Sequence, residues 1–214
     1  MTDPVSVSPM RKWMRTRSFG RIGRDLANPA VRQTLLLWLV AVAVSFVSIA
    51  IAPGAIGLLG AGLALVTIAI AVIDWRSFVI PNWLNAAGLC LAFIHAAALE
   101  PDAVLWAIAM AAIRGAALAL VFLALRSAYS WFRGRQGLGL GDVKLAAVAG
   151  AWLDWLIIPI AIEIAAVAAL SGYVLRQLVL GRSISTTNRV PFGFFFAPTI
   201  WICWVLEMTW LAPA

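Results

Sequence analysis

The chain has 214 residues, of which 64% are hydrophobic and only 12% are charged. Soluble domains contain about 45–50% apolar residues, so this composition excludes an ordinary soluble globular protein and a disordered chain. The apolar surplus suffices for about six or seven membrane-spanning helices of about 20 residues each. The sequence therefore predicts an all-α, polytopic helical membrane protein.

The formal net charge of +7 is interpreted first as a sign of membrane topology. Lysine and arginine gather in the cytoplasmic loops of membrane proteins, so we expect no nucleic-acid partner. Residues 1–33 are polar and basic and are expected to form a cytoplasmic arm, suited to binding anionic lipid headgroups. Residues 34–214 are expected to form one transmembrane domain.

Apolar runs separated by short polar segments define the expected helices. The first run is interpreted as a retained membrane helix, because it is longer than the apolar region of a secretory signal peptide. The expected spans are residues 34–52, 55–73, 82–98, 103–125 and 192–211, and the apolar stretch 143–180 is divided near Asp154 and Pro159 into a short and a long helix. Residues 74–82 and 126–142 are expected as turns or loops.

One orientation places nearly all cationic loop residues on the same side of the membrane. With the amino terminus in the cytoplasm, Glu100, Asp102 and Asp154 fall outside and the basic loops fall inside. This arrangement satisfies the positive-inside rule.

Asp74 and Asp142 are the first candidates for chemistry, because ionisable groups at or inside membrane helices are costly. Asp74 is expected at the carboxyl end of a helix, where the helix dipole disfavours a carboxylate. It either marks the interface beside Arg76 or serves a function. Asp142 is either a helix N-cap or a functional group. Gly139 and Gly141, just before it, allow a partner to approach the backbone closely.

Both aspartates are predicted at the cytoplasmic ends of different helices, and therefore at one membrane depth. Two carboxylates that approach within about 3 Å cannot both ionise, so they share a proton and provide one base and one acid. Such a pair can hydrolyse a peptide bond. The base takes a proton from water, and the acid polarises the scissile carbonyl.

Three segments, in this order, resemble the prepilin peptidases among the GxGD intramembrane aspartic proteases. The segments are Asp74 with Ile80-Pro81-Asn82, then Gly139-Leu140-Gly141-Asp142-Val143-Lys144-Leu145, and finally Val190-Pro191-Phe192-Gly193. The resemblance covers about residues 55–210.

The resemblance implies a membrane-embedded endopeptidase that removes the leader of pilin-like precursors at the cytoplasmic face of the bacterial inner membrane. Asp74 and Asp142 would be its catalytic pair. Lys144 is expected to face lipid phosphates or an acidic residue of the substrate. The remaining residues implied to bind substrate or shape the site are Pro81, Asn82, Gly139, Gly141, Pro191, Phe192 and Gly193.

The sequence also departs from the family pattern. Larger members carry a methyltransferase region with paired Cys-x-x-Cys motifs, whereas Cys90 and Cys203 are the only cysteines here. We therefore expect the short form, similar to the peptidases of Flp-type pili, acting on prepilin or pseudopilin peptides. Phe194 stands where many members have proline, which leaves the local helix geometry open.

The remaining polar residues give weaker signals. Arg114 and Glu163 lie inside expected spans, and we hypothesise that they pair. His95 and both cysteines are interpreted as packing residues, and no metal or cofactor is expected. Two other functions remain open: a proton-coupled transport protein, or a non-catalytic scaffold for pilus assembly.

Overall fold

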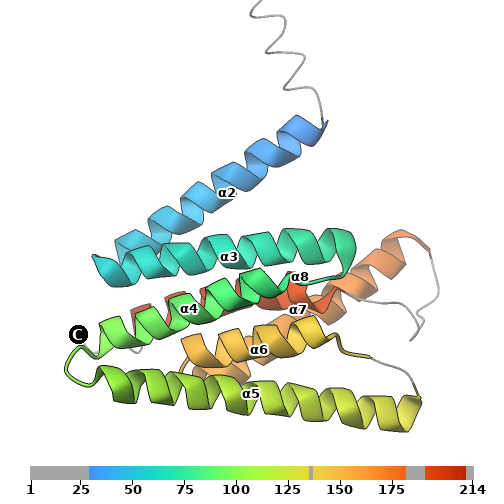
Figure 1. Ribbon diagram of the computed structural model, residues 1–214. Helices are drawn as coiled ribbons and strands as arrows, with labels where there is room; N and C mark the ends of the chain where they lie inside the picture. Colours follow the sequence, from blue (N-terminus) through green and yellow to red (C-terminus); the bar gives the residue numbers. More distant parts are fainter. Residues whose placement is uncertain (1–28, 135–136, 182–190, 211–214) are drawn as a thin grey trace, which may run out of the picture. The chain divides into compact units, whose positions relative to one another are not determined.

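The structure is a computed structural model that describes residues 29–134, 137–181 and 191–210. Within these ranges the chain forms seven α-helices and no strand (Figure 1), which confirms the all-α prediction. The helices are α2 (Pro29–Ile51), α3 (Ala55–Ser77), α4 (Asn82–Leu99), α5 (Val104–Arg133), α6 (Leu140–Trp152), α7 (Ile157–Val179) and α8 (Phe192–Trp210).

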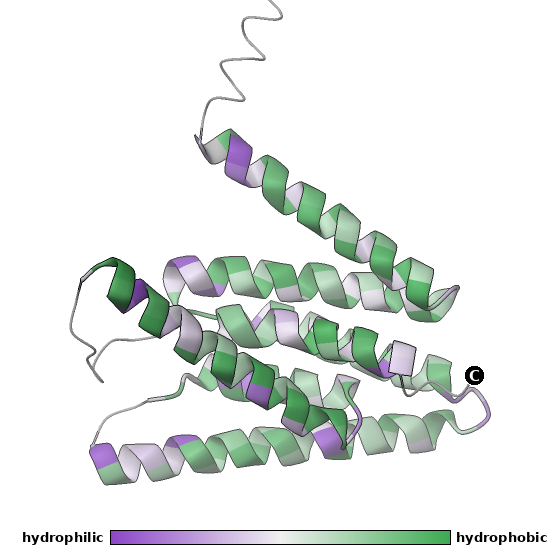
Figure 2. Cartoon of the chain, turned by 180° about the vertical axis from the view of Figure 1, so that it is seen from behind, coloured by the Kyte–Doolittle hydropathy of each residue, from purple (hydrophilic) through white to green (hydrophobic). Residues whose placement is uncertain are grey.

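Six of the described helices are long and apolar enough to cross a membrane. The exception is α6, which has 13 residues. Hydrophobic residues cover most of the length of each helix (Figure 2). The chain is therefore a multi-pass membrane protein, in agreement with the predicted six to seven helices.

The chain divides into two units, residues 1–43 and 44–214. The described part of the first unit is the beginning of α2, where Trp38, Leu39 and Val42 are exposed. Exposed apolar side chains on a helix of this length suit a lipid environment. The expected basic arm lies almost wholly before Pro29 and outside the described residues, so its boundary at residue 33 remains a prediction.

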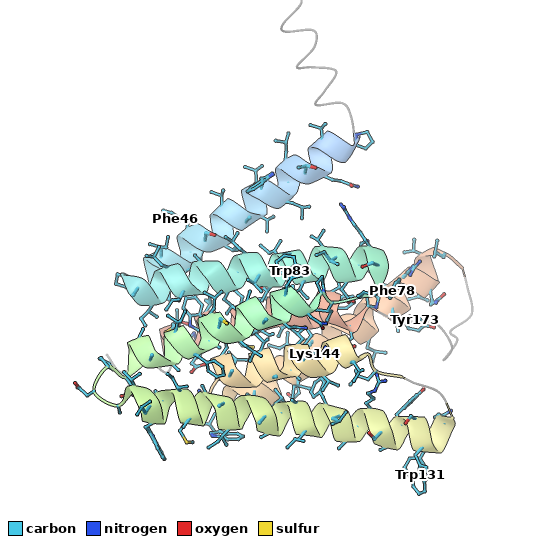
Figure 3. The ribbon with its side chains drawn as sticks, viewed as in Figure 1. Phe46, Phe78, Trp83, Trp131, Lys144 and Tyr173 are labelled. Carbon is cyan, nitrogen blue, oxygen red and sulfur yellow. The ribbon has the colours of Figure 1, made fainter. Side chains whose placement is uncertain are left out.

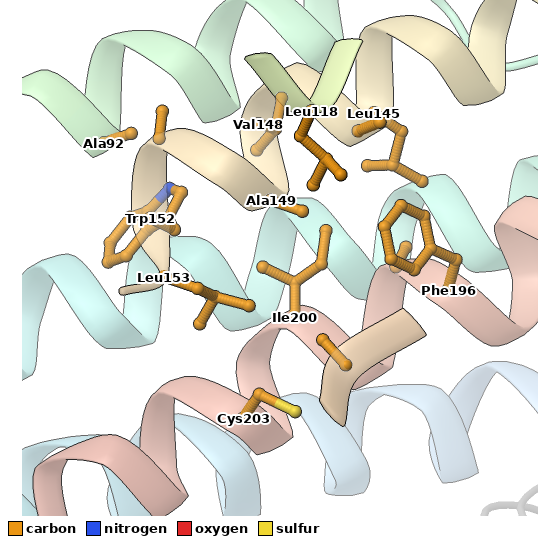
Figure 4. Packing of buried hydrophobic residues seen from close by; sticks show 14 of the residues in the cluster. Ala92, Leu118, Leu145, Val148, Ala149, Trp152, Leu153, Phe196, Ile200 and Cys203 are labelled. Carbon is orange, nitrogen blue, oxygen red and sulfur yellow. The ribbon is translucent and has the colours of Figure 1, made fainter. Parts of the chain in front are cut away.

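In the second unit, α6 contacts α4, α5 and α8. The helix α3 packs against α4 and α8, and α7 packs against α8. The buried core is built largely from α6 and α8, and Figure 4 shows Leu145, Trp152, Phe196 and Ile200 within it. The short helix therefore lies inside the bundle.

Two glycines bring the backbones of α5 and α6 together. A Cβ atom on Gly115 would lie 2.8 Å from the carbonyl oxygen of Ala147, and one on Gly150 would lie 2.5 Å from that of Arg114. Small residues allow this close approach of membrane helices. The pairing of residues 114 and 115 with 147 and 150 makes the two helices antiparallel neighbours.

The helix α3 extends past its predicted end. It continues to Ser77, so Asp74 lies in its last turn and the predicted turn at 74–82 is shorter, at residues 78–81. The prediction was wrong because a fall in hydropathy indicates a polar environment, whereas a helix ends only where its backbone hydrogen bonds end. The helix stops at Phe78, whose φ of 54° is left-handed and whose N–H donates to the carbonyl oxygen of Asp74 at 2.9 Å.

The helix α5 likewise continues past residue 125 to Arg133 and ends at Gly134, which has a φ of 65°. Glycine adopts this left-handed conformation readily at a helix end. The predicted loop at 126–142 is therefore helical in its first eight residues. At 1.5 Å per residue, the 30 residues of α5 are about 45 Å long and exceed the hydrocarbon core of about 30 Å.

The long apolar stretch after residue 142 divides near Asp154, as predicted. The helix α6 ends at Trp152, and α7 begins at Ile157. Pro159 does not contribute to the break, because it lies in the first turn of α7, where its missing N–H leaves no intrahelical hydrogen bond unmade.

Substituting Gly150 with alanine tests the close packing of α5 and α6. We expect Gly150→Ala to lower the free energy of unfolding by about 1–3 kcal/mol, because the added methyl group meets the backbone of Arg114. Thermal unfolding of the purified protein in detergent measures the change. Gly62→Ala is the matched control, since its added methyl group would lie 3.4 Å from a Leu91 side chain, an ordinary contact. Equal stability of the two variants would contradict the packing.

Candidate active site

Asp74 is a buried carboxylate in the last turn of α3. Its exposed fraction is 5%, and its Oδ2 accepts a hydrogen bond from the backbone N–H of Phe194 at 2.9 Å. Phe194 belongs to the first turn of α8, where backbone N–H groups have no partner inside the helix. The contact therefore joins the end of α3 to the beginning of α8. A second contact between the same helices is the ring of Trp75, 4.9 Å from that of Phe194.

Asp142 lies in the first turn of α6, but it is not the N-cap. Gly139 occupies that position, and Asp142 is the third helical residue. The Asp142 Oδ2 accepts a hydrogen bond from the N–H of Gly139 at 3.1 Å, so the side chain reaches back over the helix start. The N-cap interpretation is therefore wrong in its position: Asp142 contributes to capping from the third helical residue, and its second carboxylate oxygen is not used in this contact.

The charge of Asp74 acts on Asp142, which places the two carboxylates within electrostatic range. Asp142 lies in α6, outside the six candidate spans, and is partly buried. Burial raises the pKa of Asp142 from 3.8 to about 6; the hydrogen bond from Gly139 lowers it and the charge of Asp74 raises it. A raised pKa of this kind is common in functional sites. The shared proton between the two groups stays a prediction.

The two aspartates also lie at the same depth in the bundle. Asp74 is 19 residues from the start of α3, which corresponds to about 28 Å. In the antiparallel pairing of α5 and α6, Asp142 lies level with Phe122, 18 residues or about 27 Å from the start of α5. We call this end of the bundle, where α3 ends and α6 begins, the aspartate end.

Ile80 fills the space between the helices that carry the two aspartates. Its side chain is buried, and it lies against two glycines: a Cβ atom on Gly141 would be 3.1 Å from the Ile80 Cβ, and one on Gly193 would be 2.7 Å from its Cδ1. The Gly193 position also lies beside Asp74, 3.0 Å from Oδ2. The close approach that the sequence predicts at Gly141 is thus made by the Ile80 side chain. The same side chain also approaches Gly193 closely.

The structure brings together two further predicted site residues. Lys144 donates a hydrogen bond from Nζ to the Oδ1 of Asn82 at 2.6 Å, which links α6 to the first residue of α4. Both side chains are exposed, and Figure 3 labels Lys144 on α6. Pro81 is the N-cap of α4, so the helix begins at the next residue, Asn82.

The third predicted segment lies at the start of α8. Val190 is outside the described residues, Pro191 is buried, and Phe192 is the first residue of the helix. The Phe192 ring stacks on Phe196 at 5.2 Å and lies 6.3 Å from Phe122 of α5. In the described part of this segment, Gly193 is the residue whose position lies beside Asp74.

Two neighbours of the aspartates, Ile80 and Phe194, and one buried residue of α4, Asn85, were not predicted as site residues from the sequence. In the sequence, Ile80 is part of the Ile80-Pro81-Asn82 motif, and Phe194 is a departure from the family pattern. The geometry left open at Phe194 is a regular first helical turn whose N–H binds Asp74, a contact that proline could not make because it has no N–H. Asn85, one turn after Asn82, is buried without a side-chain partner. A polar residue on the buried face of a membrane helix was the available signal for Asn85.

The hypothesis that Arg114 pairs with Glu163 is wrong. The Arg114 Nε donates to the carbonyl oxygen of Gly150 at 3.3 Å, and the carboxylate within its electrostatic range is Glu207. Glu163 is exposed on α7. The arginine therefore caps the end of α6, where backbone carbonyls need partners.

His95 is a packing residue, as predicted. Its Nε2 accepts a hydrogen bond from the Trp204 indole at 3.1 Å, and its ring lies 4.4 Å from that of Trp152. Cys203 is also buried in the core, whereas Cys90 is exposed, so the packing interpretation is wrong for Cys90. In the described part of the chain, no three His, Cys, Asp or Glu side chains are grouped as metal ligands would be.

The sequence matches the model of the type IV leader peptidase family over residues 61–174, a range that contains both aspartates. The chain belongs to the type IV leader peptidase family. The matched range also includes the Ile80 segment and the Lys144–Asn82 contact, whereas the Pro191 segment lies beyond it.

Individual relatives agree with this family. A prepilin leader peptidase/N-methyltransferase of Aeromonas hydrophila is 30% identical over 199 residues, covering 91% of this chain and 64% of the relative. One from Burkholderia pseudomallei is 33% identical over 165 residues, 69% of this chain and 48% of the relative. The leader peptidase HopD of Salmonella typhimurium is 39% identical over 97 residues, 45% of this chain and 57% of the relative. The chain thus spans less than two thirds of the length of these relatives. No solved structure matches it.

The burial of Asp142 predicts a stability that depends on pH. Because its pKa is higher in the folded chain than the ordinary 3.8, the protonated carboxyl stabilises the fold fully below pH 3.8, and this contribution is lost as the pH rises through about 6. Asp142→Asn removes the buried charge and keeps an oxygen acceptor for Gly139. We expect the variant to be more stable than the wild type at pH 7.5 by up to about 3 kcal/mol, with the difference vanishing near pH 4.

Thermal unfolding at both pH values measures this difference. Asp102→Asn is the control, because Asp102 is exposed in the turn before α5 and its substitution should change neither value. A lower stability of Asp142→Asn at pH 7.5 would mean that the charged carboxylate is the stabilising form.

Proposed function

We propose that the chain is a membrane-embedded aspartic endopeptidase that removes the leader peptide from type IV pilin-like precursors, with Asp74 and Asp142 as its catalytic pair. The observation that carries the proposal is that the Ile80 side chain packs against Gly141, next to Asp142, and against Gly193, beside Asp74, which brings the two carboxylates to one end of the bundle. They come from different helices, lie at the same depth and interact electrostatically. The family match supports the substrate class, because the curated relatives are named as prepilin leader peptidases.

The chemistry follows from the different surroundings of the two aspartates. Asp142, with its pKa raised to about 6, is the member that we assign as the acid, which polarises the scissile carbonyl and later protonates the leaving amine. Asp74 is oriented by the N–H of Phe194 and is assigned as the base that takes a proton from the attacking water. An acid and a base at one site supply the two proton transfers that hydrolysis of a peptide bond requires.

The site is assigned to the cytoplasmic face of the bacterial inner membrane, with the amino terminus in the cytoplasm. The charge distribution supports this orientation. Arg76, Arg126, Arg133 and Lys144 lie at the aspartate end of their helices, whereas acidic residues lie in the turn after α4 and the turn after α6. The positive-inside rule then places the aspartate end in the cytoplasm.

The other predicted site residues shape the surroundings of the two aspartates in this proposal. Gly141 and Gly193 make room beside the aspartates, and Pro81 begins the helix that carries Asn82. Lys144 is exposed even though it binds Asn82, so it remains available to lipid phosphates or to an acidic residue of the precursor. The rest of this group, Gly139, Pro191 and Phe192, shapes the helix ends that surround the pair.

Co-expression with candidate precursors, Flp-type prepilins among them, tests the proposal. We expect the wild type to shorten its precursor, and Asp74→Asn and Asp142→Asn each to reduce cleavage by at least about 100-fold, because each variant removes a proton-transfer group. Gel mobility and mass spectrometry of the precursor measure cleavage. Asp102→Asn is the matched control and should cleave like the wild type.

The outcomes separate the proposal from its alternatives. Cleavage that survives either substitution, at equal membrane insertion, would remove that aspartate from the catalytic pair. A wild type that cleaves no precursor would contradict the peptidase and favour the proton-coupled transporter or the assembly scaffold.

A further inference from the structure

Asn85 is an unusual residue for the interior of a membrane bundle. Its exposed fraction is 3%, and both its Nδ2 and its Oδ1 are buried without a hydrogen-bond partner. Among the described residues, the other buried side-chain atom in this situation is the single Oε1 of Gln177. A buried polar group without partners is costly, and each case in a native structure calls for an explanation.

The position of Asn85 relates it to the aspartates. It lies between two contacts that join α4 to α6: Asn82 binds Lys144 one turn before it, and Gly88 packs against Val148 one turn after it. A Cβ atom on Gly88 would lie 2.8 Å from a Val148 methyl group, so the two helices are close at this level. Asn85 therefore faces α6 about one helical turn, or about 5 Å, deeper than Asp142.

The chemistry of the amide indicates what it would bind. An asparagine side chain has an acceptor oxygen and an NH₂ donor group. A backbone peptide group has an N–H donor and a C=O acceptor, so the two can form complementary hydrogen bonds. Lipid acyl chains offer neither. An extended peptide that leaves water to reach aspartates at this depth brings unsatisfied N–H and C=O groups with it, and the protein must supply partners for them.

We propose that the side-chain amide of Asn85 is a substrate-positioning group that hydrogen-bonds the peptide backbone of the precursor as it enters between α4 and α6. This inference rests on the proposed peptidase function. The bond between Lys144 and Asn82 is the outermost described link between the two helices, so it opens first when the peptide enters. The Asn85 amide, which has no hydrogen-bond partner without the peptide, then forms two hydrogen bonds to it.

Asn85→Leu separates this role from a structural one. Leucine has the same number and branching of side-chain heavy atoms and no polar atoms, so the variant loses the peptide contact and also loses the cost of burying an unpartnered amide. We expect its melting temperature to rise. In an Asp74→Asn background, which prevents turnover, we expect its dissociation constant for a purified type IV prepilin to increase about five- to tenfold.

The matched control is Thr67→Val. Thr67 is equally buried on α3, but its hydroxyl donates to the carbonyl oxygen of Ala64 at 3.0 Å, so it is satisfied within its own helix. We expect this variant to bind the prepilin like the Asp74→Asn parent and to show no rise in melting temperature. Both measurements use the full chain in lipid nanodiscs.

The result that overturns the inference is an unchanged dissociation constant or a lower melting temperature for Asn85→Leu. In the active enzyme, a lower kcat with an unchanged KM would also overturn it, because that pattern indicates an interaction made only in the transition state and not one that binds the precursor. Failure of the proposed function looks different: the wild type then leaves the prepilin uncut, while binding and its dependence on Asn85 are still measured in the Asp74→Asn background.

Discussion

The hydrogen bond from the Phe194 N–H to the buried carboxylate of Asp74 fixes the geometry on which the candidate site depends. A helix start has free N–H groups, and a carboxylate inside a bundle needs donors, so each end of this contact satisfies the other. The contact holds α3 against α8. Gly193, in the same turn, leaves space for Ile80, which in turn lies against Gly141 at the start of α6. Three helix ends are thus joined around one carboxylate.

The other end of α6 is held by separate polar contacts, which do not involve Asp74 or Phe194. The helix is too short to cross the membrane, so its last turn lies within the bundle beside α5. Arg114 donates to the carbonyl of Gly150, and Glu207 accepts from the N–H of Asp154 at 3.3 Å. The last carbonyl groups of a helix have no partner within that helix, so a donor from a neighbouring helix stabilises its end. These two charged residues therefore allow a short helix to present Asp142 at one end.

Much of this organisation could be predicted from the sequence, because hydropathy reports directly on the membrane. The spans, the break at Asp154 and the shared depth of the two aspartates all follow from apolar runs and loop charges. The ends of α3 and α5 could not be predicted in the same way. Their last turns, with Arg76 and Arg133, are polar but still helical, and hydropathy does not distinguish a helix leaving the membrane from a loop.

The side-chain partners were less predictable than the spans. Arg114 was paired with the wrong carboxylate, because two charges in separate spans do not reveal which helices are neighbours. Ile80 is an ordinary apolar residue in the sequence, and its place between two glycines emerges only when α6 and α8 are seen together. Asn85 differs, since a polar residue on an inward helix face can be recognised from the sequence alone.

The lengths of α3 and α5 have a further consequence for the lipid around the protein. The aspartates lie about 27–28 Å from the opposite ends of these helices, close to the thickness of an average hydrocarbon core of about 30 Å. With the far ends held at their own interface, acyl-chain length sets how far the two carboxylates stand from the headgroups. Shorter acyl chains bring the pair toward water, and longer ones draw it into hydrocarbon. Bilayer composition is therefore part of the environment that determines their ionisation.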